Sequence, residues 1–183
     1  MSKEIKILGF TGSLRRNSFN KAALREAQAL VPEGASLEIF DLAPIPFFNE
    51  DVEAQGWPAA VAQFRSAIAA ADALLLVTPE YNYSIPPVLK NALDWASRGK
   101  DSPLSGKPAA IMSASTGMLG GARAQYHLRQ VGVVLNLQFL NRPEVFIANA
   151  AAKFDQEGRL TDAPTREVIR KLVNALVEQA RKE

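Results

Sequence analysis

Polar side chains gather directly after the first apolar run of the chain. Residues 5–11 form this run, and the loop that follows contains Ser13, Arg15 and Ser18. Apolar residues then recur at helical spacing, with Asn20 near the start of the predicted helix. The free N–H groups and positive dipole end of such a helix attract anions, and the polar side chains add further donors. The stretch therefore predicts a site for a phosphate group, carried by a nucleotide or a flavin.

Two other interpretations of this loop remain open. Ser18 can be a simple helix N-cap, and Arg15 and Arg16 can be solvated surface side chains. The sequence contains neither G-x-G-x-x-G nor G-x-x-x-x-G-K-S/T, so it predicts neither a Rossmann fingerprint nor a Walker loop.

Positive charge is concentrated near the predicted phosphate loop. The chain has 21 Lys and Arg against 19 Asp and Glu, and this net charge of +2 does not indicate a nucleic-acid partner. Residues 1–25 nevertheless contain six basic residues and one acid, whereas residues 26–64 contain seven acids and no Lys or Arg. This asymmetry favours an anion site, although an ordinary basic face would show the same pattern.

Length and composition limit the class of protein. With 48% hydrophobic content, residues 1–183 are expected to form a single domain with a sizeable core. No apolar run is long enough to cross a membrane, and Met1 leads into the first strand without a signal-peptide core. Cysteine is absent, which excludes disulfides and thiolate chemistry. We therefore expect a cytoplasmic protein with no membrane partner and no metal site.

A second polar loop follows the continuous apolar run Ala73–Val77. Its candidate binding residues are Pro79, Glu80, Tyr81, Asn82 and Tyr83. Tyrosine offers a broad π-face to a planar ring, and Asn82 offers a donor and an acceptor to the ring's polar edge. Partial burial or a role in an interface would explain the two tyrosines equally well.

A third polar loop follows the predicted strand Pro108–Met112 and is rich in Gly and Ser. Ser115, Thr116 and Gly117 can bring amides and hydroxyls close to the carbonyl edge of a ring. Ser115 and Gly117 complete the set of candidate binding residues.

Alternating strands and helices must place these loops together. Strands are expected at residues 5–11, 37–40, 73–77 and 108–112, with a fifth strand region from Val133 to Leu140 that can include 145–147. Helices are expected between them, the fourth running to about Gly132, and an amphipathic helix follows Pro164. Residues 41–55 read as a loop.

This alternation predicts an α/β, flavodoxin-like three-layer fold with a five-stranded parallel sheet in the order 2-1-3-4-5. Ligands of such sheets bind beyond the carboxyl ends of the strands, where the winding reverses between strands 1 and 3. The three polar loops would converge there. A phosphate site at one end and a site for a flat heteroaromatic ring at the other describe flavin mononucleotide (FMN).

Three motifs in this order resemble the NADPH-dependent FMN reductase family, and within it the chromate reductase and quinone reductase branch. The motifs are Gly12-Ser13-Leu14-Arg15 with Ser18-Phe19-Asn20, Pro79-Glu80-Tyr81-Asn82-Tyr83-Ser84, and Leu89-Lys90-Asn91-Ala92-Leu93-Asp94-Trp95. Residues 120–123 and 125–130 strengthen the resemblance, which extends to about Glu144.

The resemblance implies non-covalent FMN, reduction by NADH or NADPH, and quinones, chromate or other small acceptors as oxidants. It also implies a homodimer or homotetramer with the flavin near the subunit boundary. The phosphate-loop positions of the family match Ser13, Arg15, Ser18 and Asn20, and the positions beside the flavin ring match residues 80–83 and Ser115. Pro87 stands where the family pattern usually has glycine, and proline donates no N–H.

In this interpretation the flavin carries out the redox chemistry, so no catalytic side chain is expected. The nicotinamide would pass a hydride to the flavin and leave before the acceptor binds, which predicts ping-pong kinetics. His127, the only histidine, is expected to be structural. Arg123, Tyr126 and Arg129 share one helix face and can form either a subunit contact or a solvated surface.

Two alternative functions remain. A flavodoxin-type electron carrier would have the same fold, but such carriers usually present acidic surfaces, whereas the pI of this chain is about 9.0. A flavin-free nucleotide-binding sensor would lack a yellow cofactor. The choice between NADH and NADPH also stays open.

Overall fold

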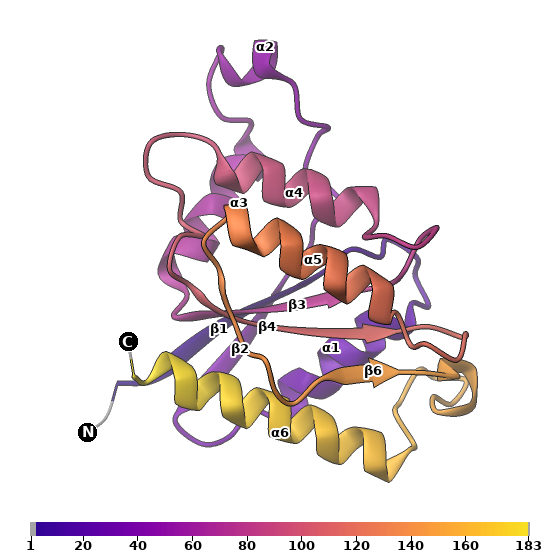
Figure 1. Ribbon diagram of the computed structural model, residues 1–183. Helices are drawn as coiled ribbons and strands as arrows, with labels where there is room; N and C mark the ends of the chain where they lie inside the picture. Colours follow the sequence, from indigo (N-terminus) through magenta and orange to yellow (C-terminus); the bar gives the residue numbers. More distant parts are fainter. Residues whose placement is uncertain (1–2, 183) are drawn as a thin grey trace.

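The computed structural model describes residues 3–182 and shows a parallel sheet enclosed by helices on both faces (Figure 1). The strands are β1 (Ile5–Thr11), β2 (Ala35–Phe40), β3 (Ala73–Thr78), β4 (Pro108–Ala114), β5 (Gln138–Phe139) and β6 (Val145–Ile147). The helices are α1 (Phe19–Ala29), α2 (Glu50–Glu53), α3 (Ala59–Ala70), α4 (Pro87–Ser97), α5 (Ala122–Val134) and α6 (Ala163–Ala180), with a 3₁₀ turn, η1 (Ala150–Ala152).

The strand order is β2-β1-β3-β4-β5, and all neighbouring strands run parallel, which confirms the predicted order. Thr11 lies opposite Val77, and Val77 lies opposite Met112, so β1, β3 and β4 end close to the same level. β5 pairs with the start of β4 and β6 pairs with its end, so both occupy the fifth position of the sheet. The loops after β1, β3 and β4 therefore leave the sheet at one edge.

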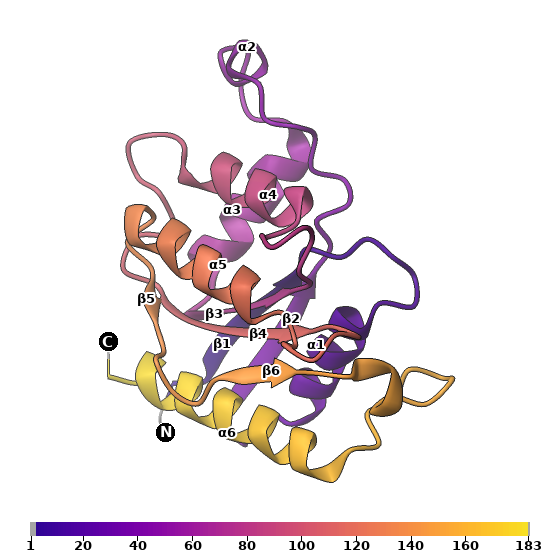
Figure 2. The ribbon, with the colours of Figure 1, turned by 45° about the vertical axis from the view of Figure 1, so that its right-hand side comes forward.

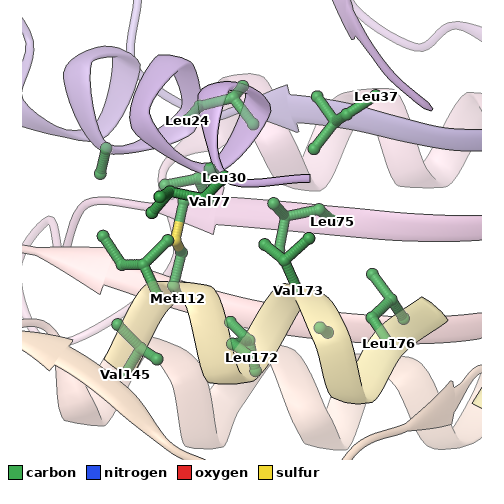
Figure 3. Close-up of a cluster of buried hydrophobic side chains, with 14 of the residues drawn as sticks. Leu24, Leu30, Leu37, Leu75, Val77, Met112, Val145, Leu172, Val173 and Leu176 are labelled. Atoms are coloured by element: carbon green, nitrogen blue, oxygen red, sulfur yellow. The ribbon is translucent and has the colours of Figure 1, made fainter. Parts of the chain in front are cut away.

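Each face of the sheet has its own hydrophobic core. Helices α1 and α6 cover one face, whereas α3, α4 and α5 cover the other (Figures 1 and 2). Figure 3 shows the first core, in which Leu24 of α1 and Leu172 of α6 pack with sheet residues such as Leu75. Leu74 and Leu76 point into the second core. β3 is thus buried on both faces, which explains its continuous apolar sequence.

Helix α5 is longer than the sequence indicated. It continues through Gly132 to Val134, so the prediction that the helix ends near Gly132 was wrong. The ring of Phe139 lies so close to Gly132 that a Cβ atom there would be 2.1 Å from Cε2 of the ring. Gly132 therefore permits close packing of α5 on β5 instead of ending the helix, and Asn136, with φ 54°, makes the reversal.

Residues 41–58, here called the arm, run along the outer side of α4 and carry α2 beyond the rest of the molecule (Figures 1 and 2). The sequence indicated only a loop here, and α2 is a single turn within it. The carbonyl oxygen of Pro46 accepts hydrogen bonds from Asn91 Nδ2 (2.9 Å) and Trp95 Nε1 (2.8 Å). These bonds, from polar groups on the outer face of α4, hold the base of the arm.

Arg65 of α3 ties this region together at the end of α4. Its Nη1 atom donates to the carbonyl oxygens of Ala96 (2.6 Å) and Arg98 (2.7 Å), and its guanidinium lies 4.4 Å from the ring centroid of Trp57. Burial lowers the pKa of Arg65, and the nearby Glu53 opposes that shift. The guanidinium satisfies carbonyl oxygens at the end of α4, next to the turn at Gly99 (φ 85°).

At the other end of the sheet, where the strands begin, Asp72 precedes β3 and bonds it to β1. Its carboxylate accepts hydrogen bonds from Lys3 Nζ (2.6 Å) and from the Lys6 N–H group (2.9 Å). Burial raises the pKa of Asp72, but the bonds from Lys3 and Lys6 outweigh it, so the pKa is below its ordinary value of 3.8. The charged form is therefore favoured by folding, and its contribution is complete above 3.8 and lost as the pH falls through the folded pKa.

We expect Asp72→Asn to lower the free energy of unfolding by about 1 kcal/mol at neutral pH. The loss should shrink at a pH well below 3.8, because the wild-type carboxyl is then also neutral. Urea unfolding at both pH values measures the difference, with Asp51→Asn on α2 as a control. A loss that is equal at both pH values would contradict this role of the charge.

No helix within residues 3–182 is both long enough and apolar enough to span a membrane. The expectation that the chain has no leader rests partly on Met1 and Ser2, which lie outside the described residues.

Candidate functional site

The loops after β1 and β3 touch at Gly12. A Cβ atom at Gly12 would lie 2.3 Å from Cγ of Pro86 and 2.9 Å from Cβ of Leu89. Both neighbours belong to the start of α4, where Pro86 is the N-cap and Pro87 begins the helix. Only glycine allows this approach, and the contact confirms that the first two predicted loops lie side by side.

The loop after β1 has the features of an anion site. Ser13 and Ser18 are buried, whereas Arg15 and Arg16 are exposed. Ser18 is the N-cap of α1, since its Oγ atom accepts the Asn20 N–H (3.2 Å) and the Lys21 N–H (3.4 Å). Within the described residues, the backbone N–H groups of residues 14–19 have no acceptor in the chain. These N–H groups and two guanidinium groups are available to a phosphate.

Asn20 has a second, structural task. Its side-chain Nδ2 donates to the carbonyl oxygen of Ala114 (2.9 Å), and its Oδ1 accepts the Ala114 N–H (2.9 Å). The buried amide thus bonds α1 to the end of β4 in the manner of a strand pair. Both functional groups of this predicted binding residue are already engaged, so its contribution to a ligand is to fix the loop.

The loop after β3 forms a tight turn at its tip. Tyr81 and Ser84 exchange two backbone hydrogen bonds, of 2.9 and 3.0 Å. Asn82 (φ 47°) and Tyr83 (φ 71°) between them both adopt the left-handed conformation, which is unfavourable for a bulky residue such as tyrosine. Pro79 is buried before the turn, and the rings of Tyr81 and Tyr83 are exposed. The turn therefore presents two aromatic rings and an amide to solvent on a constrained backbone.

Helix α5 holds this turn at two points. The Glu80 carboxylate caps the start of α5: its Oε2 atom accepts the N–H groups of Arg123 (3.1 Å) and Ala124 (3.4 Å). On the other side of the turn, Ser84 Oγ lies 3.1 Å from His127 Nδ1. The Glu80 carboxylate supplies the cap of α5 from another element, because Gly121, the N-cap residue of α5, has no side chain. The Glu80 side chain is thus committed to α5, and its backbone remains for a ligand.

Arg123 completes the connection between the turn and α5. Its Nε atom lies 2.8 Å from Oε1 of Glu80, and its guanidinium stacks on Tyr83 with 3.6 Å between Cζ and the ring centroid. The sequence placed Arg123 on a helix face but gave it no position in the site. Its place in the first turn of α5, after two glycines, is the signal that could have found it.

A cavity of about 440 Å³ lies between the loops after β3 and β4. Its lining includes Glu80, Tyr83, Ser115, Gly117 and Arg123. Ser115 is fixed there because its Oγ atom accepts the Gly117 N–H (3.1 Å) and its own N–H donates to Ile147 of β6 (3.0 Å). The structure thus brings these predicted residues together, and the cavity can accept a flat ring between backbone and aromatic surfaces.

A smaller hollow of about 230 Å³ borders the loop after β1 on the side of α1. Arg15, Arg16 and Ser18 line it together with Arg25 and the loop at residues 155–158. The predicted residues thus fall into two groups, a cationic group at the start of α1 and an aromatic and hydroxyl-bearing group at the cavity. Asn20 joins the two groups through its bonds to β4.

Together, the strand order and the candidate site at the carboxyl ends of β1, β3 and β4 define a protein of the flavodoxin-like class. The site combines anion donors with a cavity suited to a ring, as a flavin nucleotide requires.

Comparison with known proteins identifies the family. Residues 5–152 match the family model described as NADPH-dependent FMN reductase, so the chain belongs to this family. An NAD(P)H-dependent FMN reductase of Pseudomonas aeruginosa is 58% identical over 176 residues, covering 96% of this chain and 95% of that protein. A quinone reductase of Escherichia coli K12 is 44% identical over 170 residues, covering 90% and 89%.

The fold is also shared with a solved structure. FerB, a flavoenzyme NAD(P)H:(acceptor) oxidoreductase from Paracoccus denitrificans, superimposes with a TM-score of 0.89 at 31% identity, covering 97% of this chain and 98% of FerB. The predicted family and fold are thereby confirmed, and at the level of the family so is the predicted cofactor pair of FMN and NAD(P)H.

Proposed function

We propose that this protein is an FMN-dependent oxidoreductase that uses NADH or NADPH to reduce quinones, chromate or similar small acceptors. The observation that carries the proposal is the convergence at one end of the sheet of a loop with free N–H groups, at Ser13–Ser18, and a cavity lined by Ser115 and Gly117. The quinone reductase relative from Escherichia coli supports quinones as acceptors.

Two groups of residues would hold FMN, one at the phosphate and one at the ring system. Arg15, Ser13 and the free N–H groups of residues 14–19 would bind the phosphate, and the backbone of residues 79–82 with Ser115 and Gly117 would contact the ring system. The tyrosine rings would border the open side. When bound, FMN supplies the redox chemistry by accepting a hydride and releasing two electrons, so the protein needs no catalytic acid or base.

The reductant and the acceptor would use the same space in turn. The cavity of about 440 Å³ would have to hold the flavin ring as well, which leaves space for one further flat ring at a time. This arrangement supports ping-pong kinetics, with the nicotinamide leaving before the acceptor enters.

Turnover by the purified, FMN-loaded protein tests the function. NADPH or NADH oxidation with naphthoquinone should require FMN but no second protein, and initial rates at several acceptor concentrations should give parallel double-reciprocal lines. A flavodoxin-type carrier would show no oxidation without a separate reductase. Adding chromate or free FMN in place of naphthoquinone determines the range of acceptors, and comparing the two nicotinamides determines the preferred reductant.

The phosphate assignment has its own test. We expect Arg15→Ala to weaken FMN binding about tenfold, because a charge-assisted bond to the phosphate is lost from an exposed position. Titration of the apoprotein, followed by quenching of flavin fluorescence, gives the affinity. Arg142→Ala, which removes an exposed arginine from another loop, is the control. An unchanged affinity in Arg15→Ala would remove Arg15 from the phosphate site.

We further propose that residues 1–183 form a single flavodoxin-like FMN-binding domain that assembles as a homodimer or homotetramer in the cytoplasm. The outer face of α5 supports assembly, because Tyr126, Val133 and Val134 are 55%, 80% and 83% exposed. Light scattering across a range of protein concentrations tests the oligomeric state, and cell fractionation tests the location.

A further inference from the structure

Three arginines, Arg15, Arg16 and Arg25, line the hollow of about 230 Å³ beside α1. All three are exposed residues. Within residues 3–182, Arg16 and Arg25 form no ion pair or side-chain hydrogen bond, and the Arg15 guanidinium only lies near the Phe19 ring, 5.5 Å from its centroid. The hollow therefore presents guanidinium donors that have no acceptor in the described part of the chain.

The two carboxylates that line the hollow are already paired. Oδ2 of Asp155 lies 2.7 Å from Nε of Arg159, and Oε2 of Glu157 lies 3.1 Å from Nη2 of the same side chain. Oδ1 of Asp155 also accepts the Arg159 N–H (2.8 Å), which fixes the turn at residues 155–159. With Arg159 included, four cations surround the hollow against two carboxylates, so the hollow should attract an anion.

Arg25 is placed for a different anion from the one at the start of α1. It follows Phe19, the first residue of α1, by six residues, which is about 9 Å along the helix axis. Its guanidinium lies against the turn at residues 155–159, because a Cβ atom at Gly158 would be 3.5 Å from Nη2 of Arg25. The flavin phosphate is assigned to the N–H groups of residues 14–19, so Arg25 is available to a second anion beside it.

One segment of the chain borders both this hollow and the cavity at Ser115. The N–H groups of Asn149 and Ala150 donate to the carbonyl oxygens of Gly117 (3.2 Å) and Ser115 (3.0 Å). The chain then continues through η1 to residues 155–158, which line the hollow (Figure 2). A dinucleotide has the two ends that this arrangement suits, a ring for the cavity and a remote phosphate for the hollow.

We propose that the hollow binds the 2′-phosphate of NADPH, and that Arg16 and Arg25 make the protein prefer NADPH to NADH. The two coenzymes differ only in this phosphate, so a preference requires a group that binds it. A guanidinium donates two parallel N–H bonds to phosphate oxygens. The hollow is smaller than the range of about 300–1,000 Å³ for a whole ligand, so it suits a terminal group. The proposal rests on the proposed function, because it selects the reductant of that same site.

The test compares the two reductants in FMN-loaded Arg25→Met, with naphthoquinone as the acceptor. In the wild type, kcat/KM should be about tenfold higher for NADPH than for NADH. Arg25→Met should lower kcat/KM about tenfold for NADPH and change it less than about twofold for NADH, so the preference disappears. The loss should appear in KM, because the phosphate is bound equally before and during hydride transfer. Arg25→Lys keeps the charge without the planar fork and should recover part of the loss.

Two further variants separate the local effect from a general effect of charge. Glu157→Gln removes a negative charge from the hollow, so the KM for NADPH should fall about twofold while the KM for NADH stays unchanged. Lys100→Met removes an exposed positive charge from the loop after α4, on the opposite face of the sheet, and should change neither KM. Circular dichroism checks the folding of each variant. A loss of FMN affinity in Arg25→Met would assign the hollow to the flavin phosphate and overturn the proposal.

Binding without turnover provides an independent readout. Calorimetric titration of the oxidised, FMN-loaded protein should give a Kd about tenfold lower for adenosine 2′,5′-bisphosphate than for adenosine 5′-phosphate, and Arg25→Met should remove this difference. Inorganic phosphate should bind at least about tenfold more weakly than the bisphosphate. Equal binding of the two would indicate an anion site without specificity for the coenzyme and would overturn the proposal.

The kinetic comparison can also contradict the proposal. A wild type that uses NADH as efficiently as NADPH, or a preference that is unchanged in Arg25→Met, would overturn it. If the wild type oxidised neither coenzyme, the proposed function would fail, whereas the calorimetric comparison would still decide whether the hollow binds the 2′-phosphate.

Discussion

Replacing Gly12 by alanine is expected to weaken FMN binding by about 100-fold or more, equivalent to roughly 2.7 kcal/mol. The added Cβ atom would lie 2.3 Å from Cγ of Pro86 and 2.9 Å from Cβ of Leu89. Neither neighbour can rotate away, because one belongs to a proline ring and the other is attached directly to the α4 backbone. The loop after β1 must then move away from the loop after β3, and its phosphate donors move with it.

Rescue by a second substitution would establish this cause. Pro86→Ala removes the closest atom, so Gly12→Ala/Pro86→Ala should recover much of the affinity that the single variant loses. Gly106→Ala is the control, since Gly106 has a demanding backbone (φ 75°) but, among the described residues, no neighbour within 4 Å of an added Cβ. That variant should lose about 1 kcal/mol of stability and no affinity for FMN. A double variant as weak as Gly12→Ala would contradict the steric explanation.

Arg65→Met is expected to lower the free energy of unfolding by about 3 kcal/mol, or the melting temperature by roughly 6–12 °C. Methionine keeps much of the apolar stem of Arg65 but leaves the carbonyl oxygens of Ala96 and Arg98 without their donor. The bonds from Arg65 to the carbonyl oxygens of Trp95 and Asp101, at 3.4 and 3.3 Å, are lost as well. Trp57 also loses the cation stacked on its ring.

Thermal and urea unfolding measure this loss. Arg65→Lys keeps the charge but cannot reach several carbonyls with a planar fork, so its loss should be intermediate. Arg170→Met on α6 removes an arginine whose ion pair with Glu167 is exposed, and it should cost less than about 1 kcal/mol. FMN affinity should be nearly unchanged in Arg65→Met, because the start of α4, not its end, contacts Gly12. A stability equal to that of the wild type would show that water replaces the guanidinium fully.

Local sequence patterns predicted most of the fold. The buried strand β3 followed from its continuous apolar residues, and the start of α1 followed from the helical spacing after Ser18. Ser18 is the N-cap of α1, as the alternative interpretation of the loop held. The strand order followed from the alternation of elements. Gly132 is the exception, because its position inside α5 depends on Phe139, and no pattern within the helix records the packing of that ring.

The candidate site was predictable in its location but not in the tasks of its side chains. Ser115 and Gly117 do line a cavity next to the loop after β3. Asn20, however, bonds to a residue 94 positions away, and Glu80 bonds to the start of α5, 43 positions away. Such long-range partners have no local signature, so sequence reasoning assigned both side chains to the ligand. Arg123 was left outside the site for the same reason.

The amide of Asn20 has one last consequence. Since α1 and β4 are joined by bonds within the chain, the proposed phosphate site is already formed before any ligand binds. Flavin binding should therefore cost little conformational entropy, and the loops should stay folded when the flavin dissociates and binds again. Colourless protein stripped by dialysis should therefore turn yellow again upon simple mixing, with a heat-capacity change that reflects only the surface covered by the flavin.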